Sequence, residues 1–498
     1  MSKSSEDAFQ IPVIAGIGEL TDRNDSYEPR KLIAEAVRLA LADSRGSAEQ
    51  IDSIDVISVA SFKYDDIAGL IAADTGLEPS RAMESVVGGE KPIRLLGEAA
   101  ERIAAGQDRA AIICGGEAMR TRAHAAKNGT KLDWGPADPG ARPSSPLDYV
   151  TEQAARHGLT QPVNVYPLYE NATRRTWMQT LAEGQAESAA LWRLYSLAAA
   201  ENPHAWLGRE VAAEAVESET SDNRLIAFPY RKLMVANPMV NQAAAVLVTS
   251  LGRAREWGLD QDDLVFIGSG ARANEPRDFL ARDRFDRSSA QDIVLARTLD
   301  ANCKAAADID HWELYSCFPT VPKMARRALG LDLATPPSIA GGLTFFGAPA
   351  NNYMTHAITA AVRTLRAEKE GDALLYGQGE FVTKHAAILL SGKQREGHPI
   401  MLDAQSEADA AMGDRPELLA SYEGPATVET FTIIYDRNGE PTQLPVVVRT
   451  PSGARTVALG DLRDESLAAF FASRDADPIG SPGVVRAADD KTLLFSRA

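Results

Sequence analysis

A short glycine-containing segment near the N-terminus recurs in the middle of the chain, and this repeat constrains the fold more than any other feature. The segment VIAGIGELTDRN at 13–24 is similar to LVFIGSGARAN at 264–274. Aligning Gly16 with Gly268 also places Asp55 close to Asp310, at nearly the same offset. A unit that repeats at half the chain length indicates a duplicated domain.

Apolar runs of strand length alternate with stretches of helical periodicity along both copies. In the first copy the pattern predicts strands at 11–20, 54–62, 81–87 and 109–116, with helices at 29–44, 66–74 and 92–106. In the second copy it predicts helices at 290–306 and 352–367, and strands at 264–274, 308–316, 372–379 and 385–392. This alternation is typical of a doubly wound α/β layer with parallel strand pairs.

Two regions do not follow the alternation, and they divide the chain. Residues 118–222 contain a Pro-rich stretch and then helical segments rich in Trp, Tyr and Arg, which indicates a large insertion. Its aromatic side chains either build a local core or line an acyl pocket. Residues 426–450 alternate apolar and polar around an Asn-Gly turn, a hairpin signal in a small β-rich module. We therefore expect an N-terminal half at 10–251, a C-terminal half at 262–393 and an additional barrel-like domain at 400–498.

Composition excludes several classes of function. The net charge of −17 opposes a general nucleic-acid-binding face, and no apolar run is long enough for a membrane span. The seven histidines and three cysteines lack metal-ligand spacing, so we predict no metal site. Few cysteines and a polar N-terminus indicate a cytoplasmic protein.

Three motifs give the chain its resemblance to a known family. They are GGEAM at 115–119, ELYSCF at 313–318 and GGLTFFGAP at 341–349. With the duplicated halves and the insertion, they make residues 10–393 resemble the thiolase superfamily, and residues 400–498 resemble the small domain added in the type 1 thiolase-like proteins. The sterol-carrier-protein type of thiolase is similar as well. The resemblance implies a duplicated βαβαβαββ, five-layer fold followed by a small, OB-like barrel.

The resemblance also shows what this chain lacks. Thiolases use a nucleophilic cysteine, an Asn or His in a second loop, the His of a Gly-His-Pro loop and a second cysteine that moves a proton. The corresponding positions here are Gly89, Tyr315, Ala348 and the cysteine-free segment 375–379. Thiolysis through an acyl-cysteine is therefore not expected in its usual form.

Other side chains are candidates to replace the missing groups. The resemblance to thiolase-like aldolases favours Tyr315 and Tyr353 as acid/base groups, because a phenol can donate or accept a proton. His356 lies three residues after Tyr353 and can share its helix face, and His385 is a further acid/base candidate. Cys317 is a substitute nucleophile or an inner packing residue. Each of the tyrosines and histidines has the alternative role of packing in the core.

A CoA ester is the expected small-molecule partner, as substrate and not as a tightly bound cofactor. CoA phosphates favour arginine and lysine, and the resemblance places candidates for this contact in or near the insertion: Arg174, Arg175, Arg231 and Lys232. It also places Gly89, Gly347 and Asn352 beside the bound ester.

Two functions remain open from the sequence. The first is an enzyme of acyl-CoA or β-keto acid metabolism that makes or breaks a C–C bond by acyl transfer, retro-Claisen or retro-aldol chemistry. The second is a non-catalytic CoA-ester-binding protein or a subunit that needs a partner. Thiolases are usually dimers or tetramers, so the resemblance leaves a homodimer open, with the added domain able to block or remodel that interface. The negative charge and the apolar pattern predict no nucleic-acid or membrane partner.

Overall fold

Two sets of strands with the same pairing pattern form the main sheet. The computed structural model describes residues 7–46, 48–141, 145–395, 397–473, 475–488 and 492–497. The strands run in the order β3-β2-β4-β7-β1-β8-β11-β10-β9. The first set is β1 (Pro12–Thr21), β2 (Ser53–Val56), β3 (Arg81–Glu84), β4 (Ala110–Ala118) and β7 (Asn241–Ser250). The second is β8 (Val265–Asn274), β9 (His311–Leu314), β10 (Asp372–Gly379) and β11 (Lys384–Ser391).

The pairing confirms the duplication that the sequence indicates. The series β2-β4-β7-β1 and the series β9-β10-β11-β8 each contain one parallel pair followed by two antiparallel pairs. The two sets meet where β1 pairs with β8, antiparallel, at Val13 with Phe266 and Ile14 with Val265. A mixed α/β fold built from two similar halves follows from this symmetry.

Two predicted strands are shorter than the sequence analysis expected. The strands predicted over 54–62 and 81–87 end at Val56 and Glu84. Beyond Val56 the chain turns, and the buried carboxylate of Glu117 accepts the backbone N–H groups of Ala60 and Ser61 at 2.7 Å each. The Glu117 side chain thus binds backbone N–H groups that a neighbouring strand would otherwise bind.

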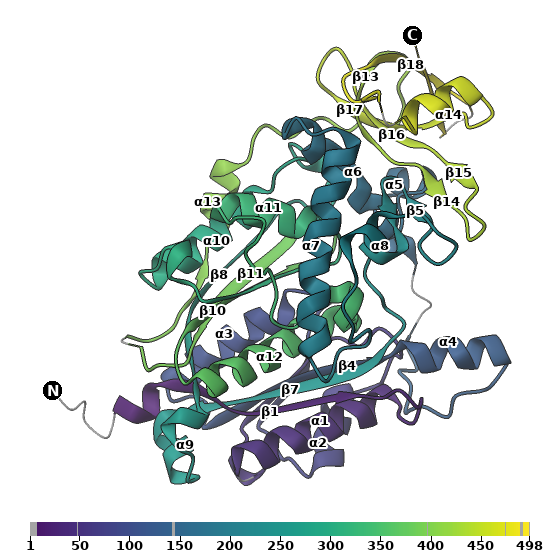
Figure 1. Ribbon diagram of the computed structural model, residues 1–498. Helices are drawn as coiled ribbons and strands as arrows, with labels where there is room; N and C mark the ends of the chain where they lie inside the picture. The colour runs from purple at the N-terminus through teal and green to yellow at the C-terminus, as the bar shows by residue number, and fades with distance from the viewer. Residues whose placement is uncertain are drawn as a thin grey trace.

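Two helices lie between the layers of the sheet and carry most of the candidate site. They are α3 (Lys91–Ala104) and α12 (Tyr353–Glu368), and they pack on each other and on strands of both sets. Figure 1 shows both helices between β1, β4 and β7 on one side and β8, β10 and β11 on the other. The outer faces are covered by α1 (Pro29–Ser44) and α2 (Ile67–Thr75), and by α10 (Ser289–Ala301) and α11 (Thr320–Leu329). This arrangement gives the five layers.

The position of α3 follows from its sequence. Pro92 lies in the first turn, where a missing backbone N–H costs nothing. Buried side chains such as Ile93, Leu96 and Ile103 recur at helical spacing. A helix between two layers of the sheet must bury most of its surface, and α3 therefore brings its N-terminus into the interior of the molecule.

The insertion consists of helices that connect the two halves to the C-terminal region. Its elements are α4 (Met119–Asn128), α5 (Glu152–Arg156), α6 (Pro162–Thr176), α7 (Leu181–Glu201), α8 (Ala213–Glu217), β5 (Leu225–Ala227) and β6 (Tyr230–Arg231). Many of its aromatic side chains, such as Tyr169 and Trp192, are fully buried. Among the described residues, no helix has the length and apolar character of a membrane span.

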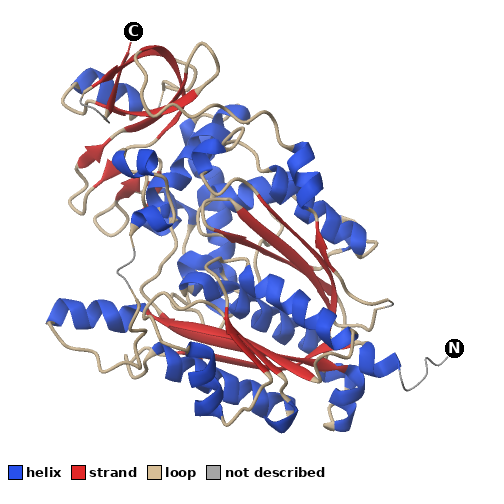
Figure 2. Cartoon of the chain, turned by 180° about the vertical axis from the view of Figure 1, so that it is seen from behind, coloured by secondary structure: helices blue, strands red, loops and turns tan. Residues whose placement is uncertain are grey.

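The C-terminal region forms a closed barrel that sits on the insertion. Its strands are β13 (Gly424–Phe431), β16 (Pro445–Arg449), β17 (Arg455–Gly460), β18 (Pro482–Ala487) and β19 (Leu493–Arg497), with α14 (Glu465–Phe471) alongside. Figure 2 shows it at one end, next to the helices of the insertion. The predicted hairpin is present, and its tip, β14 (Ile434–Tyr435) with β15 (Pro441–Gln443), pairs with β5 of the insertion. The barrel is thus joined to the insertion through a shared sheet.

Candidate active site

The N-terminus of α3 is the centre of the candidate site. The chain enters the helix through Gly88, Gly89 and Glu90, and Tyr315 approaches this entry from the end of β9. A Cβ atom added to Gly89 would lie 2.5 Å from the Tyr315 hydroxyl oxygen and 2.4 Å from the carbonyl oxygen of Gln378. Distances below 3 Å exclude any side chain at position 89 unless its neighbours move. Tyr315 therefore occupies the space that a nucleophile at position 89 would need.

Among the buried tyrosines that the structure describes, Tyr315 alone has a hydroxyl group that makes no hydrogen bond. Tyr315 is 6% exposed. By contrast, hydroxyl hydrogen bonds are made by Tyr64, Tyr166, Tyr169, Tyr195, Tyr230, Tyr353 and Tyr376. Burial raises the pKa of Tyr315 well above its usual range, and the neighbouring Cys317 and Glu90 side chains act in the same direction. The phenol is therefore protonated, and it has a proton available for a ligand.

Tyr353 lies against Tyr315, but its hydroxyl is already engaged. The two rings meet edge to face with their centroids 5.9 Å apart. The Tyr353 hydroxyl donates to Glu313 Oε1 at 2.7 Å and accepts from the Gly342 backbone N–H at 2.9 Å. Glu313 also accepts from Ser338 Oγ and two backbone N–H groups, and burial raises its pKa. Tyr353 thus ties the loop at 341–347 to β9 and supports the Tyr315 ring.

His356 belongs to a different buried cluster. Its Nδ1 lies 2.7 Å from Glu19 Oε1, and the other Glu19 oxygen accepts from Thr359 and Arg363. Burial alone would raise the pKa of Glu19, but the hydrogen bond and charge of His356 and the charge of Arg363 lower it to about 2. The Phe346 ring contacts both Tyr353 and His356. The structure therefore places His356 on the β1 side of α12 and does not bring it to Tyr315.

His385 is a buried link in a hydrogen-bond chain on the β11 side of the sheet. Its Nε2 lies 3.2 Å from the carbonyl oxygen of Val382, so Nε2 carries the proton and Nδ1 accepts from the Tyr376 hydroxyl at 2.7 Å. Burial, with a further contribution from the charge of Arg282, lowers the pKa of His385 to about 3. The imidazole is therefore neutral at physiological pH.

The low pKa of His385 makes the stability of the protein depend on pH. Between the usual pKa of about 6.5 and about 3, the unfolded chain binds a proton that native His385 does not. This contribution to stability is complete above pH 6.5 and is lost as the pH falls toward 3. Between pH 6 and 5 the free energy of unfolding of the wild type is expected to fall by about 1 kcal/mol more than that of His385→Asn. Urea denaturation at the two pH values measures this difference, and equal slopes for both proteins would contradict it.

The cysteines do not supply an activated thiol. Cys317 Sγ lies 3.6 Å from Gln378 Oε1, and burial raises the pKa of Cys317 to about 12. Cys114 is fully buried in β4, where burial raises its pKa further. Cys303 is exposed after α10, away from the α3 entry. A thiolate at the candidate site is therefore not available.

The residues predicted to hold CoA phosphates mostly have protein partners. Arg174 and Arg175 both form ion pairs with Asp477 of the C-terminal region, and Arg231 pairs with Glu219. Lys232 is exposed. Their role in phosphate binding stays a prediction, because two of these guanidinium groups also fasten the insertion to the C-terminal region.

Asn352 and Gly347 hold the loop that leads into α12. Asn352 Nδ2 donates to the Gly115 carbonyl oxygen at 2.7 Å. Gly347 has φ = 121°, and an added Cβ would lie 2.5 Å from Gln242 Oε1. Both residues fix the backbone next to Ala348, and their predicted contact with a CoA ester stays a prediction.

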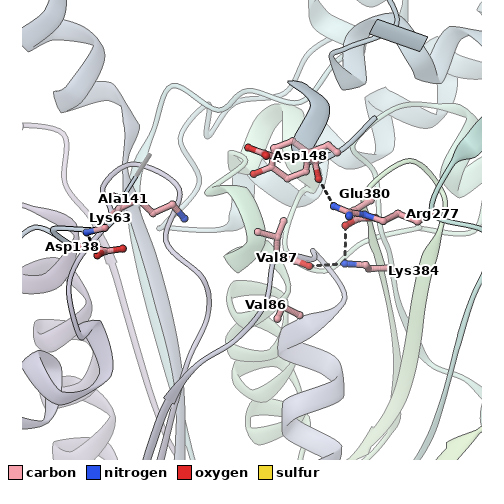
Figure 3. A pocket seen from close by; sticks show the side chains of 11 residues that line it. Lys63, Val86, Val87, Asp138, Ala141, Asp148, Arg277, Glu380 and Lys384 are labelled. Carbon is pink, nitrogen blue, oxygen red and sulfur yellow. Dashed lines mark hydrogen bonds and ion pairs between the residues drawn. The ribbon is translucent and has the colours of Figure 1, made fainter. Parts of the chain in front are cut away.

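A cavity of about 680 Å³ opens beside the entry to α3 (Figure 3). Val86 and Val87, which lead into Gly88, form part of its wall, as does Glu380, which follows Gly379. Lys384 Nζ donates to the Val87 carbonyl oxygen at 2.8 Å and pairs with Glu380, and Arg277 contacts Glu380 and the Asp148 backbone (Figure 3). The cavity wall thus carries both cationic and acidic side chains, and it includes the residues next to Gly88 and Gly379 in the chain.

Two buried carboxylates of this site, Glu90 and Glu313, are not evident as site residues from the sequence. Glu90 follows Gly89 directly, and Glu313 is the first residue of the ELYSCF motif. Both are at most 3% exposed. The only hint in the sequence was a charged residue next to Gly89 and another near the end of a predicted strand. Such a residue can equally well be exposed, so the sequence does not show that these two are buried.

Comparisons with known proteins show which proteins this chain is similar to. The family described as "Thiolase-like protein type 1 additional C-terminal domain" matches residues 404–491. A monomeric SCP2-thiolase-like protein type 1 from Mycobacterium smegmatis superposes with a TM-score of 0.84 at 28% identity, covering 98% of this chain and 99% of that one. No curated protein sequence matches significantly.

Two further solved structures share the fold at lower identity. The "Ltp2-ChsH2(DUF35) aldolase" has a TM-score of 0.61 at 18% identity, and an acetyl-CoA acetyltransferase from Syntrophomonas wolfei has a TM-score of 0.55 at 14% identity. Each covers 77% of this chain and 99% of its own. The protein is thus thiolase-like in fold. Residues 404–491 match the additional C-terminal domain of the type 1 thiolase-like proteins, and the whole chain is similar to a solved protein of that type.

Proposed function

We propose that this protein is an enzyme that breaks or forms a C–C bond next to the carbonyl group of a CoA thioester or β-keto acid, without an acyl-cysteine intermediate. The observation that carries the proposal is the Tyr315 hydroxyl, which is buried, protonated and unbonded at the N-terminus of α3. Such a donor in a site with little water stabilises an oxyanion that develops during reaction.

Retro-aldol cleavage of a β-hydroxyacyl thioester fits these groups better than retro-Claisen cleavage or acyl transfer. The latter two reactions need a nucleophile, which water or CoA itself has to supply because the site offers no thiolate. Retro-aldol cleavage needs only a donor for the enolate oxygen and an acceptor for the hydroxyl proton. Tyr315 suits the donor role, since a phenol with a raised pKa does not act as a base at neutral pH. The fold is also that of a protein named as an aldolase.

CoA thioesters are the substrate class we favour, as substrate and not as a bound cofactor. The cavity beside the site carries Lys63, Arg277 and Lys384, which suit the phosphates of CoA, together with the carboxylates Asp138, Asp148 and Glu380. A single chain suffices for this arrangement, and the M. smegmatis relative is described as monomeric. The homodimer that the resemblance leaves open stays a prediction.

Replacement of Tyr315 by phenylalanine tests this proposal. The purified protein is incubated with a panel of 3-hydroxyacyl-CoA and 3-ketoacyl-CoA esters, and the shortened acyl-CoA is measured by chromatography. Tyr315→Phe is expected to lower turnover by about 100-fold or more with little change in ester affinity. Tyr422→Phe, which removes a hydroxyl of the C-terminal region, serves as the control.

A non-catalytic CoA-ester-binding protein is the second candidate. The engagement of Tyr353, His356 and His385 in buried hydrogen bonds favours it, because these groups then serve the fold. Ester binding by the wild type without turnover of any panel member, and unchanged in Tyr315→Phe, would establish this second function instead.

A further inference from the structure

Glu90 is a buried carboxylate at the candidate site with one unsatisfied oxygen. The residue is 3% exposed, and its Oε1 lies 3.2 Å from Lys91 Nζ. Its Oε2 is buried and has no hydrogen-bond partner in the part of the chain that the structure describes. A buried carboxylate oxygen without a donor is costly, so such groups in native proteins call for an explanation.

Two glycines make the space for this carboxylate. A Cβ atom added to Gly88 would lie 2.3 Å from Glu90 Oε2, and one added to Gly379 would lie 2.2 Å from the same oxygen. The next glycine, Gly89, faces the Tyr315 hydroxyl in the same way. The unsatisfied oxygen and the unbonded phenol therefore lie beside consecutive residues of one short loop.

Helix capping does not account for Glu90. The residue occupies the N-cap position of α3, but its side chain makes no cap hydrogen bond. The Lys91 ammonium contacts Oε1 of the Glu90 carboxylate, which leaves Oε2 as an acceptor without a donor among the described residues. The cavity wall at Val87 and Glu380 continues directly into Gly88 and Gly379, the two residues that hold this oxygen.

We propose that Glu90 is the general base of this site and acts together with Tyr315 on a β-hydroxyacyl thioester. The inference rests on the proposed function and adds a catalytic residue to it. Glu90 Oε2 accepts the proton of the β-hydroxyl group. As that O–H bond breaks, the β-carbon becomes a carbonyl carbon and the Cα–Cβ bond breaks, with its electron pair moving to the enolate of the thioester. The Tyr315 hydroxyl donates a hydrogen bond to the enolate oxygen.

The same carboxyl group gives back the proton that it accepted. Protonated Glu90 returns its proton to Cα, which leaves an aldehyde or ketone and a shortened acyl thioester, with no net change in oxidation state. The reverse of this last step removes a proton from Cα of the product thioester. The base should therefore exchange the acetyl protons of acetyl-CoA with solvent even when no C–C bond breaks.

Two measurements on the full chain test the role of Glu90. The first is turnover of 3-hydroxyhexanoyl-CoA, and the second is deuterium incorporation into the acetyl group of acetyl-CoA in D₂O, followed by mass spectrometry. Glu90→Gln is expected to reduce both rates by 100-fold or more, while Glu90→Asp recovers part of the loss. Glu98→Gln, on the same helix and half-exposed in a pair with Arg94, should stay within twofold of the wild type.

The outcomes separate this inference from the proposed function. Exchange that depends on Glu90, with no cleavage of any ester, supports the base and contradicts the proposed cleavage. Cleavage that Glu90→Gln retains within twofold, but Tyr315→Phe loses, overturns the base and leaves the proposed function standing. The absence of both exchange and cleavage in the wild type overturns both. An unchanged thermal unfolding midpoint for Glu90→Gln confirms that a loss of rate is not a loss of fold.

Discussion

Gly89→Cys is expected to destabilise the protein by about 3 kcal/mol instead of restoring a thiolase nucleophile. The added Cβ would lie 2.4 Å from a backbone carbonyl oxygen, that of Gln378, and 2.5 Å from the Tyr315 hydroxyl oxygen. The carbonyl belongs to Gln378 of β10, which pairs with His385 of β11, so it is backbone and cannot turn away as a flexible side chain could. Urea denaturation measures the loss in free energy of unfolding.

A matched variant and a double variant sharpen this test. Gly208→Cys places the same side chain where only ordinary contacts at 3.6 Å or more exist, and it should change stability by less than about 0.5 kcal/mol. Combining Gly89→Cys with Tyr315→Ala should show a favourable coupling of at least about 1 kcal/mol, because one of the two clashes is removed. If Gly89→Cys were as stable as the wild type, Tyr315 would not fill the nucleophile position.

Lys323→Met is expected to cost about 3–5 kcal/mol, since it leaves a charge buried without its partner. Lys323 Nζ lies 2.5 Å from Glu170 Oε1, and both side chains are almost completely buried. The second Glu170 oxygen accepts from the Tyr230 hydroxyl at 2.8 Å. These contacts join α6 of the insertion to α11 of the second half, so their loss should loosen the insertion.

Two comparison variants isolate the effect of burial. Lys369→Met removes one member of an exposed pair with Asp262, and it should leave the free energy of unfolding nearly unchanged. Adding Glu170→Gln to Lys323→Met removes the stranded charge and should recover part of the loss. A Lys323→Met protein with wild-type stability in urea would show that the pair does not hold the insertion in place.

Much of the fold can be predicted from the sequence, because buried strands and helices place their apolar residues at regular spacings along the chain. The repeat that aligns Gly16 with Gly268 and the alternation of strand and helix patterns predicted the duplicated α/β architecture, which the strand pairing confirms. The ends of β2 and β3 were less predictable. Apolar residues after Val56 look like strand in the sequence, whereas Glu117 binds their backbone from a distant position.

The candidate site was predictable only in outline. The motifs pointed to Gly89 and Tyr315. That the Tyr315 hydroxyl leaves no room for a side chain at position 89 depends on a distance that no local sequence pattern encodes. Tyr353 and His356 share a helix, yet Glu313 and Glu19 draw them to different sides of it. The significance of Glu90 depends on its burial between two glycines and on the absence of a donor for Oε2 among the described residues.

The proposed C–C bond cleavage proceeds without a covalent acyl-enzyme. Intact-mass spectrometry of the protein during turnover of a 3-hydroxyacyl-CoA, with the products measured in the same sample, tests it most directly. We expect shortened acyl-CoA and carbonyl product, with no added acyl mass on the protein at any time. An acyl adduct that forms and decays at the rate of turnover, on Cys317 or on any other residue, would contradict this expectation.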